Sequence, residues 1–266
     1  MVCTQRRSRQ AVNSNAGSNY VYSYDQNLNR FCLTTYQGDT AYYASTSDAT
    51  PHEGRCQDNN RLVGWWKLNG NTDDSSELGN NATVHGGAVP TISQNGIGNH
   101  AYAFNGSSDF LSTTVSSEVN DLFATSGQSW TATAWFKNTR PNGSSSVIIG
   151  RGGGTGSSAT FGLSVNSSNN LFAALRGNST TIGPVDDTTW YFGAVSWDGQ
   201  TARGYLNDAA PVNLGVGTAS LQDYNFKIGA TANGNNHFPG SIDDVRLFSR
   251  ALSVSELADM YQRGAE

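Results

Sequence analysis

The sequence predicts an all-β protein, an antiparallel two-sheet sandwich of the jelly-roll type that ends in one short helix. Short segments with apolar or alternating patterns follow one another after Arg61, and turn residues separate nearly all of them. Asp198-Gly199 is one of the hairpin signals, since this pair tolerates positive φ. No helical pattern lies between the segments and no repeat of fixed period is evident. The spacing therefore favours a sandwich over an α/β fold, a propeller or a solenoid.

The first 60 residues have a different sequence pattern from the remainder of the chain. Residues 1–18 lack a sustained apolar period, so we expect a flexible tail or the remnant of a removed segment. Residues 19–60 carry aromatic side chains spaced for two or three short strands, which predicts a small β module. Cys32 and Cys56 bracket a loop rich in Thr, Tyr, Ser and Gly, and a disulfide between them would stabilise the module by roughly 3 kcal/mol. Two free thiols are the alternative, and Cys3 is left without a partner.

Residues 61–266 hold the strands of the predicted sandwich. In chain order the candidates are LVGWWKL, ATVHGG, AYAFNG, DFLSTTV, SWTATAWFK, SVIIGRG, FGLSVN, LFAALRG, TWYFGAVSW, TARGYLN, FKIGATA and SIDDVRLFS. Each is short and rich in aromatic or aliphatic residues, and most are bounded by Gly, Asn, Asp or Ser. This pattern is typical of antiparallel strands joined by tight turns.

One helix is predicted, after the last strand. Ser253 and Glu256 stand three residues apart as a capping box, and Val254, Leu257, Ala258 and Tyr261 follow on one face. We expect this helix to pack on the edge of the sandwich. A weaker helical turn is expected at residues 116–123.

Composition limits the class of protein. Charged residues make up only 14% of the chain, and Ser, Thr, Asn and Gly supply the polar surface, which suits a secreted protein. The net charge of -5 leaves no basic patch for nucleic acid. No run approaches the roughly 20 apolar residues of a membrane helix, and the start MVCTQRRSRQ lacks the apolar stretch of a signal peptide. We therefore expect that a segment for export or anchoring has been removed.

Several motifs together resemble the laminin-G-like domains of the concanavalin A-like lectin/glucanase superfamily. They are LVGWWKLNGNTDDSSELGNNATVHGG, AYAFNGSSDFLSTT, SWTATAWFK, TTWYFGAVSWDGQTARGYLND and FPGSIDDVRLFSRALSVSELADMY, which cover nearly all of residues 61–266. The resemblance implies a jelly roll, usually extracellular, that often binds calcium at the sandwich rim and commonly binds carbohydrate or protein. One departure is Phe192, where family members often carry His.

The N-terminal module is similar to parts of bacterial surface or pilin-like proteins, in which a lost N-terminal helix would anchor the chain. This resemblance implies a location outside the cell or on a bacterial cell surface.

A catalytic site is not expected. Glucanases of the superfamily present Glu-x-Asp-x-x-Glu from one strand, and the sequence has no such motif. None of its Glu residues lies in the middle of a predicted strand, and its His residues lie in loop-like contexts without a Gly-x-Ser-x-Gly elbow. An atypical glycoside hydrolase is kept as the remote alternative.

Calcium is the expected cofactor, and the resemblance selects its ligands. Asp243 matches the Asp of the family's terminal Asp-x-Val-Arg strand, and Asp74 matches the Asp of its Asp-Ser-Ser turn. Carbonyl groups near Asn71 and Gly106 would complete the site. The alternative is that Asp243 accepts backbone N–H groups and ties the rim together.

Side chains of a strand alternate between its two faces, which places the two adjacent acids in SIDDVRLFS on opposite faces. Asp244 and Arg246 share one face and are expected to pair, whereas Asp243 shares its face with Val245 and Leu247. Adjacent strand residues point to opposite faces, so these two carboxylates are not expected to act as a catalytic pair.

Four residues are predicted to contact a ligand. They lie beside turns or in Gly- and Asn-rich loops, and they are Trp197, Arg151, Asn235 and His237. Most other Trp residues are expected in the core. The predicted protein is a calcium-stabilised, non-catalytic module that binds a glycan or a surface protein; the main alternative is a structural pilin-like or adhesin subunit that contacts proteins.

Overall fold

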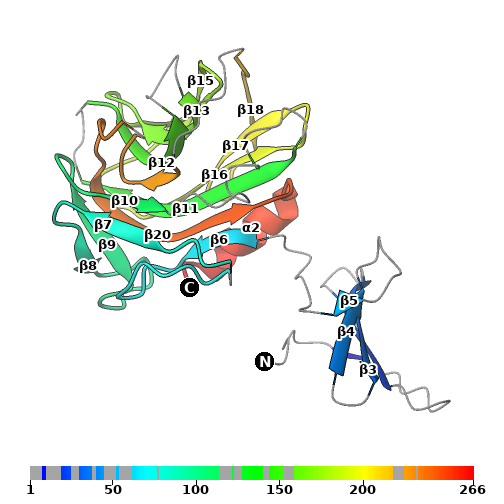
Figure 1. Cartoon of the computed structure of the whole chain (residues 1–266). Helices are drawn as coiled ribbons and strands as arrows, with labels where there is room; N and C mark the ends of the chain where they lie inside the picture. The colour runs from blue at the N-terminus through cyan, green and yellow to red at the C-terminus, as the bar shows by residue number, and fades with distance from the viewer. Residues whose placement is uncertain are drawn as a thin grey trace. The chain divides into compact units, whose positions relative to one another are not determined.

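The structure, a computed structural model, divides the chain into two compact units, Met1–Arg61 and Leu62–Glu266. It describes residues 62–266 apart from 77, 114–121, 123–127, 140–143, 153–158, 218–224 and 232, together with the strands of the first unit. Each unit is described by itself below (Figure 1).

The first unit contains an antiparallel sheet whose strands follow chain order. They are β1 (Ser8–Arg9), β2 (Asn19–Tyr24), β3 (Arg30–Gln37), β4 (Thr40–Ala44) and β5 (His52–Glu53). Two of these, β1 and β5, add to the two or three strands that the sequence predicts. Cys3, Cys56 and the side chain of Cys32 lie outside the described part of the chain, so the disulfide stays a prediction.

The second unit is a sandwich of two antiparallel sheets, as predicted (Figure 1). The seven-stranded sheet has the order β15 (Asn178–Pro184), β14 (Asn170–Leu175), β13 (Ala159–Val165), β12 (Ser146–Gly152), β19 (Lys227–Ile228), β10 (Phe110–Thr113) and β7 (Ala82–His85). The eight-stranded sheet has the order β18 (Val212–Leu214), β17 (Ala202–Leu206), β16 (Tyr191–Trp197), β11 (Trp130–Asn138), β20 (Pro239–Phe248), β9 (Ala101–Asn105) and β8 (Val89–Thr91), and β6 (Leu62–Trp66) also pairs with β20.

Alternation along the strands builds the core between the sheets. In β11 the side chains of Trp130, Ala132, Ala134 and Phe136 belong to the main core cluster, whereas Trp135 belongs to a second cluster on the outer face. Trp130 meets Phe161 from the opposite sheet with ring centroids 5.0 Å apart. The prediction that most Trp residues lie in the core therefore holds for the buried Trp130.

Helix α2 (Val254–Arg263) begins with the predicted capping box. Ser253 Oγ accepts from the N–H of Glu256, and the Glu256 carboxylate accepts from the N–H of Ser253 at 2.8 Å. Leu257 and Met260 are the buried positions, while Val254 is 50% exposed, so Val254 was wrongly placed on the apolar face. The helix covers part of the outer face of the eight-stranded sheet, where the Tyr261 ring stacks on the Trp135 ring with centroids 5.6 Å apart. The expected packing on an edge of the sandwich was therefore wrong. The helical turn expected at residues 116–123 lies almost wholly outside the described residues.

Phe192, the departure from the family pattern, belongs to the same outer layer. It is buried with Trp135, Tyr205 and Leu257, and its ring centroid is 5.6 Å from that of Trp135. Its position therefore serves the docking of α2.

Strand β20 carries a β-bulge at its two acids. The pairing with β11 slips by one residue, from Thr133 opposite Arg246 to Trp135 opposite Asp243, and Asp244 has a φ of 45°. Ile242 before the bulge and Val245 after it both face the core. Because directly opposite side chains share a face, Asp243 lies on the outer face with Trp135. The expectation that Asp243 faces inward with Val245 and Leu247 was therefore wrong, since the bulge interrupts the strand period.

No helix in the described ranges is long and apolar enough to cross a membrane.

The cap of α2 supplies a stability test. Replacing Ser253 with Ala removes the acceptor for the N–H of Glu256, and we expect the free energy of unfolding to fall by about 1 kcal/mol in urea denaturation. Gln262→Ala, at an exposed position of the same helix, is the matched control and should leave stability nearly unchanged. Equal stability of Ser253→Ala and wild type would contradict a working cap.

Candidate functional site

A polar groove of about 340 Å³ opens at the rim of the second unit. It lies where the turn after β9, the start of β12 and the loop before β20 meet. The lining residues are Gly106, Ser107, Ser144, Ser145, Gly234, Asn235, Asn236, His237 and Pro239. Three residues predicted from the sequence meet here: Asn235 and His237 as ligand contacts, and Gly106, which was assigned to calcium instead.

Backbone pairing brings these loops together. Asn105 at the end of β9 lies opposite Pro239 at the start of β20. Asn236 donates its side-chain amide to the Ser145 carbonyl at 3.0 Å, and its own carbonyl accepts from Val147 N–H at 2.9 Å. The loop before β20 is thus fixed to the start of β12.

A buried threonine fixes the shape of this loop. Thr231 Oγ1 donates to the Asn235 carbonyl at 2.7 Å and accepts from Asn235 N–H at 3.0 Å, and Gly234 N–H donates to the Thr231 carbonyl. Asn236 takes a φ of 51°, which Asn adopts more readily than most residues. The backbone of Asn235 is therefore held in place before any ligand arrives.

Several polar groups of the groove make no hydrogen bond with a described residue. They are the hydroxyls of Ser107, Ser144 and Ser145 and the side-chain amide of Asn235. His237 Nδ1 donates to the Asp109 carbonyl at 3.2 Å, because a carbonyl only accepts, and its Nε2 has no partner in the same part of the chain. Hydroxyl, amide and imidazole groups can both donate to and accept from the hydroxyls of a sugar.

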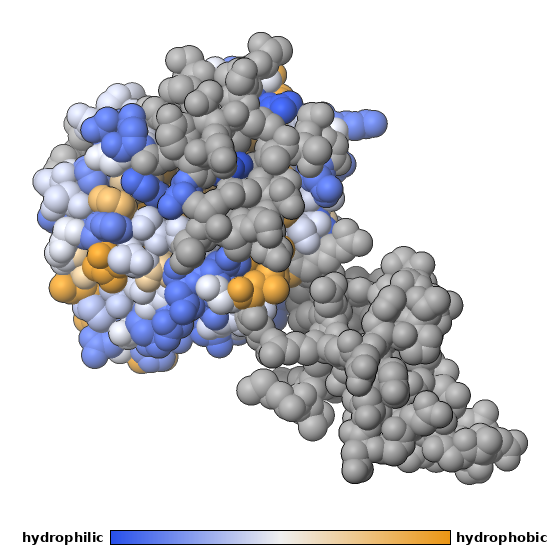
Figure 2. Space-filling view, in the orientation of Figure 1, coloured by the Kyte–Doolittle hydropathy of each residue, from blue (hydrophilic) through white to orange (hydrophobic). Residues whose placement is uncertain are grey.

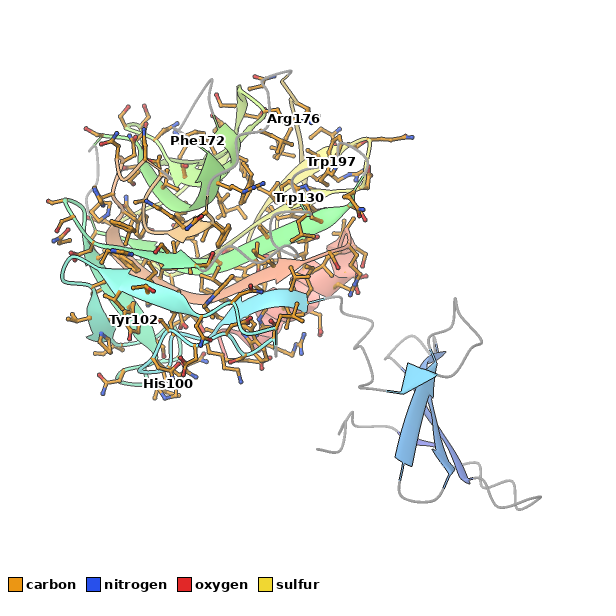
Figure 3. All side chains as sticks on the ribbon, in the orientation of Figure 1. His100, Tyr102, Trp130, Phe172, Arg176 and Trp197 are labelled. Atoms are coloured by element: carbon orange, nitrogen blue, oxygen red, sulfur yellow. The ribbon has the colours of Figure 1, made fainter. Side chains whose placement is uncertain are left out.

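Trp197 and Arg151 lie elsewhere. Trp197 stands opposite Trp130 across β16 and β11, and Figure 3 shows the two indoles close together. Arg151 is only 3% exposed and lies opposite Phe161 in β12 and β13. Neither lines the groove, and the burial of Arg151 leaves its guanidinium little access to a ligand.

The acids of β20 form a separate cluster on the outer face. Asp244 binds Arg246 through two hydrogen bonds of 2.8 Å, as predicted, although the pair is nearly buried rather than exposed. Asp244 also accepts from Trp65 Nε1 at 2.7 Å and from Glu266 N–H at 3.3 Å. Arg246 lies over the Trp65 ring at 4.4 Å. Three residues thus donate four hydrogen bonds to the carboxylate of one aspartate.

Asp243 is 1% exposed and poorly paired. Its Oδ2 accepts from Gln94 N–H at 3.5 Å, and its Oδ1 has no partner among the described residues. Burial, and secondly the negative charge of Asp244, raise the pKa of Asp243 to about 8. The folded protein therefore holds this carboxyl in its protonated form near neutral pH.

The four residues expected to bind calcium do not form one site. Asp74 already accepts four hydrogen bonds, from Trp65 N–H, Asn80 N–H and the N–H and hydroxyl of Ser76. Asn71 Oδ1 accepts from Asp73 N–H, and Gly106 lies at the groove. No group of three acidic, His or Cys residues suited to a metal occurs in the described segments. Of the four, only Asp243 has a carboxyl oxygen without a partner among the described residues.

Ser107, Ser144 and Ser145 were not among the residues predicted from the sequence to contact a ligand. The signal for them was the short turn sequences Asn-Gly-Ser-Ser at residues 105–108 and 142–145. Their meeting depends on long-range pairing of β9 with β20, which no local pattern reports.

The raised pKa of Asp243 predicts how stability varies with pH. Above its ordinary pKa the unfolded chain releases this proton while the folded protein keeps it, so the free energy of unfolding falls as pH rises from about 4 to about 8, by up to about 1.4 kcal/mol per pH unit. Asp243→Asn should remove this slope in thermal or urea unfolding with a chelator present.

The matched control for this slope is Asp208→Asn, at an exposed turn, which should keep the wild-type pH dependence. An unchanged slope in Asp243→Asn would show that Asp243 titrates normally.

Comparison with known proteins gives one family and a set of similar folds. A laminin G family model, described as the concanavalin A-like lectin/glucanases superfamily, matches residues 105–258. No curated protein matches the chain.

Solved structures share the fold at low sequence identity. The receptor-binding domain of the botulinum neurotoxin C/D mosaic serotype is 15% identical with a TM-score of 0.58, and the alignment covers 77% of this chain and 52% of that one. The binding domain of Paraclostridial Mosquitocidal Protein 1 is 13% identical with a TM-score of 0.60, covering 76% and 52%. Domain 4 of AbnA, a GH43 extracellular arabinanase from Geobacillus stearothermophilus in complex with arabinotriose, is 16% identical with a TM-score of 0.56, covering 75% and 97%.

This chain spans about half the length of the toxin binding domains, and these likenesses show the fold alone. The family match covers more than half of the chain. The protein therefore belongs to the concanavalin A-like lectin/glucanases superfamily.

Proposed function

We propose that this protein is a non-catalytic module that binds a glycan in the rim groove. The observation that carries the proposal is one concave site, with fixed loops, whose hydroxyl, amide and imidazole groups include several without a hydrogen-bond partner among the described residues. A sugar presents many hydroxyls, and each can take the place of a water on these groups. The arabinotriose complex of the AbnA domain shows that a similar fold holds an oligosaccharide, which supports this proposal.

The lining of the groove argues against hydrolysis. A glycosidase needs two carboxyl groups flanking the scissile bond, and no Asp or Glu is among the residues that line the groove. The lining also holds no carboxylate that could orient the imidazole of His237 as a general base for one of the serine hydroxyls. Binding without catalysis is the function that these residues fit.

A protein partner is the second candidate. The botulinum neurotoxin DC binding domain, a similar fold, was solved with rat synaptotagmin II. On this protein, however, few large apolar side chains in the described segments are exposed, and Figure 2 shows a mainly hydrophilic face with small hydrophobic patches. Stable protein interfaces bury well over about 1,000 Å² around an apolar centre, so the surface favours a glycan.

We also propose that the protein acts outside the cell. Its surface is rich in uncharged polar residues, and the two similar folds that bind receptors or arabinan fragments belong to a toxin and an extracellular enzyme.

Groove variants test glycan binding. On a glycan array, wild type should bind at least one oligosaccharide, and Asn235→Ala should weaken that binding by roughly 3- to 10-fold, the effect of losing one or two hydrogen bonds. Asn213→Ala, on the exposed edge strand β18, is the matched control and should bind like wild type. Absence of any glycan binding by wild type, or equal binding by Asn235→Ala, would overturn the groove proposal.

Calcium is a separate proposal that centres on Asp243. Its buried Oδ1, which has no partner among the described residues, would serve as one oxygen ligand once calcium displaces the proton of the carboxyl group. Metal that binds only the folded state stabilises it by about 2.7 kcal/mol at a hundredfold excess over Kd. The melting temperature should rise with calcium relative to chelator, and Asp243→Asn should abolish the rise. An identical melting temperature in calcium and in chelator would refute the site.

A further inference from the structure

Three basic side chains surround the ring of Phe110 beside the groove. The ring centroids of His85 and His237 lie 4.4 and 5.9 Å from that of Phe110, and Lys227 Nζ lies 4.3 Å from it. His237 also lines the groove, so the cluster and the groove share a residue. We call these four residues the basic cluster.

The strand register places the basic cluster on the outer face of the seven-stranded sheet. Phe110 lies opposite His85 across β10 and β7, which are adjacent strands in Figure 1. The alternate residue of β10, Leu111, and its partner Ile228 in β19 belong to the core. Phe110 and Lys227 are only partly buried and therefore face solvent on the other side.

Phe110 supports the cations and offers little free surface to a sugar ring. The His85 ring is stacked almost parallel to it, at 10°, and the Lys227 ammonium lies over it at cation–π distance. His85 Nε2 is fixed by Ser112 Oγ at 2.7 Å. The groups that the cluster offers to a ligand are therefore the nitrogen atoms of its Lys and His side chains.

No carboxylate in the described segments neutralises the cluster. Asp109 is next to Phe110 in sequence, but its carboxylate is buried and accepts from the N–H groups of Gly87 and Asn105. Lys227 makes no ion pair or side-chain hydrogen bond with a described residue, and partial burial lowers its pKa. A half-buried ammonium without a counterion gains free energy when an anion binds beside it.

We propose that the basic cluster binds an anionic group of the glycan, a carboxylate or a sulfate ester, and that the groove therefore selects acidic glycans. This inference rests on the proposed function, because the neutral part of the sugar would occupy the groove. Lys227 would pair with the anion, and Nε2 of His237 would donate to it when protonated. The acidic group would sit at the edge of the groove nearest Phe110.

Matched sugars test the charge. Lactose, sialyllactose and sulfated lactose share a neutral core, and trigalacturonate can be compared with its methyl ester; affinities are measured by titration calorimetry after a glycan array has shown which class binds. We expect the acidic member of a pair to bind roughly 10-fold or more tightly than its neutral partner. Preference for sialyllactose or trigalacturonate identifies a carboxylate, and preference for sulfated lactose identifies a sulfate.

Variants assign that preference to Lys227. Lys227→Gln should bring the affinity for the acidic sugar down to that for the neutral one, and Lys227→Arg should retain the difference. Lys137→Gln, which removes the same charge in β11 outside the groove and the cluster, is the control. An acidic preference that survives in Lys227→Gln would overturn the assignment. Binding of neutral glycans alone would refute this inference and leave the proposed function standing, whereas binding of no glycan would refute both.

Discussion

Strand β20 lies at the centre of the eight-stranded sheet, and its bulge decides which side chains it gives to the core. Ile242 faces the core, and an uninterrupted strand would send Asp244 and Arg246 to the same side. Burying that ion pair among apolar residues would cost several kcal/mol of desolvation. The extra residue, with Asp244 in the left-handed region that Asp tolerates better than most residues, turns Val245 inward instead.

The bulge also determines which surface is left for a ligand. It leaves both acids on the outer face, where Asp244 binds Arg246, Trp65 and the backbone of Glu266. Asn95 Nδ2 donates to the Ala265 carbonyl, and α2 packs over the part of this face that carries Trp135 and Phe192. The protein's own C-terminal residues therefore occupy the surface beside the bulge, whereas the residues that line the groove lie outside this covered area.

Local features of this protein could be predicted from the sequence, and long-range ones could not. The capping box of Ser253 needs only residues three apart, and the pairing of Asp244 with Arg246 needs only residues two apart. A Gly often marks a bulge in a sequence, but the residue with positive φ at this bulge is Asp244. The bulge was therefore not predicted, and Asp243 was assigned to the wrong face. The sequence indicated Gly106, Asn235 and His237 separately and did not show that they line one groove. Gly106 and His237 are brought together by the pairing of β9 with β20, two strands more than a hundred positions apart in the sequence.

The same polar residues that suggest chemistry in the sequence are largely used to hold turns. Asp74 accepts four hydrogen bonds, and the N–H groups of Thr188 and Thr201 lower the pKa values of Asp186 and Asp198, the latter to about 2. A carboxylate held in this way stays ionised and is a poor proton donor near neutral pH. Many of the carboxylates are therefore already hydrogen-bonded within the folded protein. The polar groups of the groove that have no partner among the described residues are hydroxyls, an amide and an imidazole. Such groups suit the proposed recognition of a ligand by hydrogen bonds and positive charge.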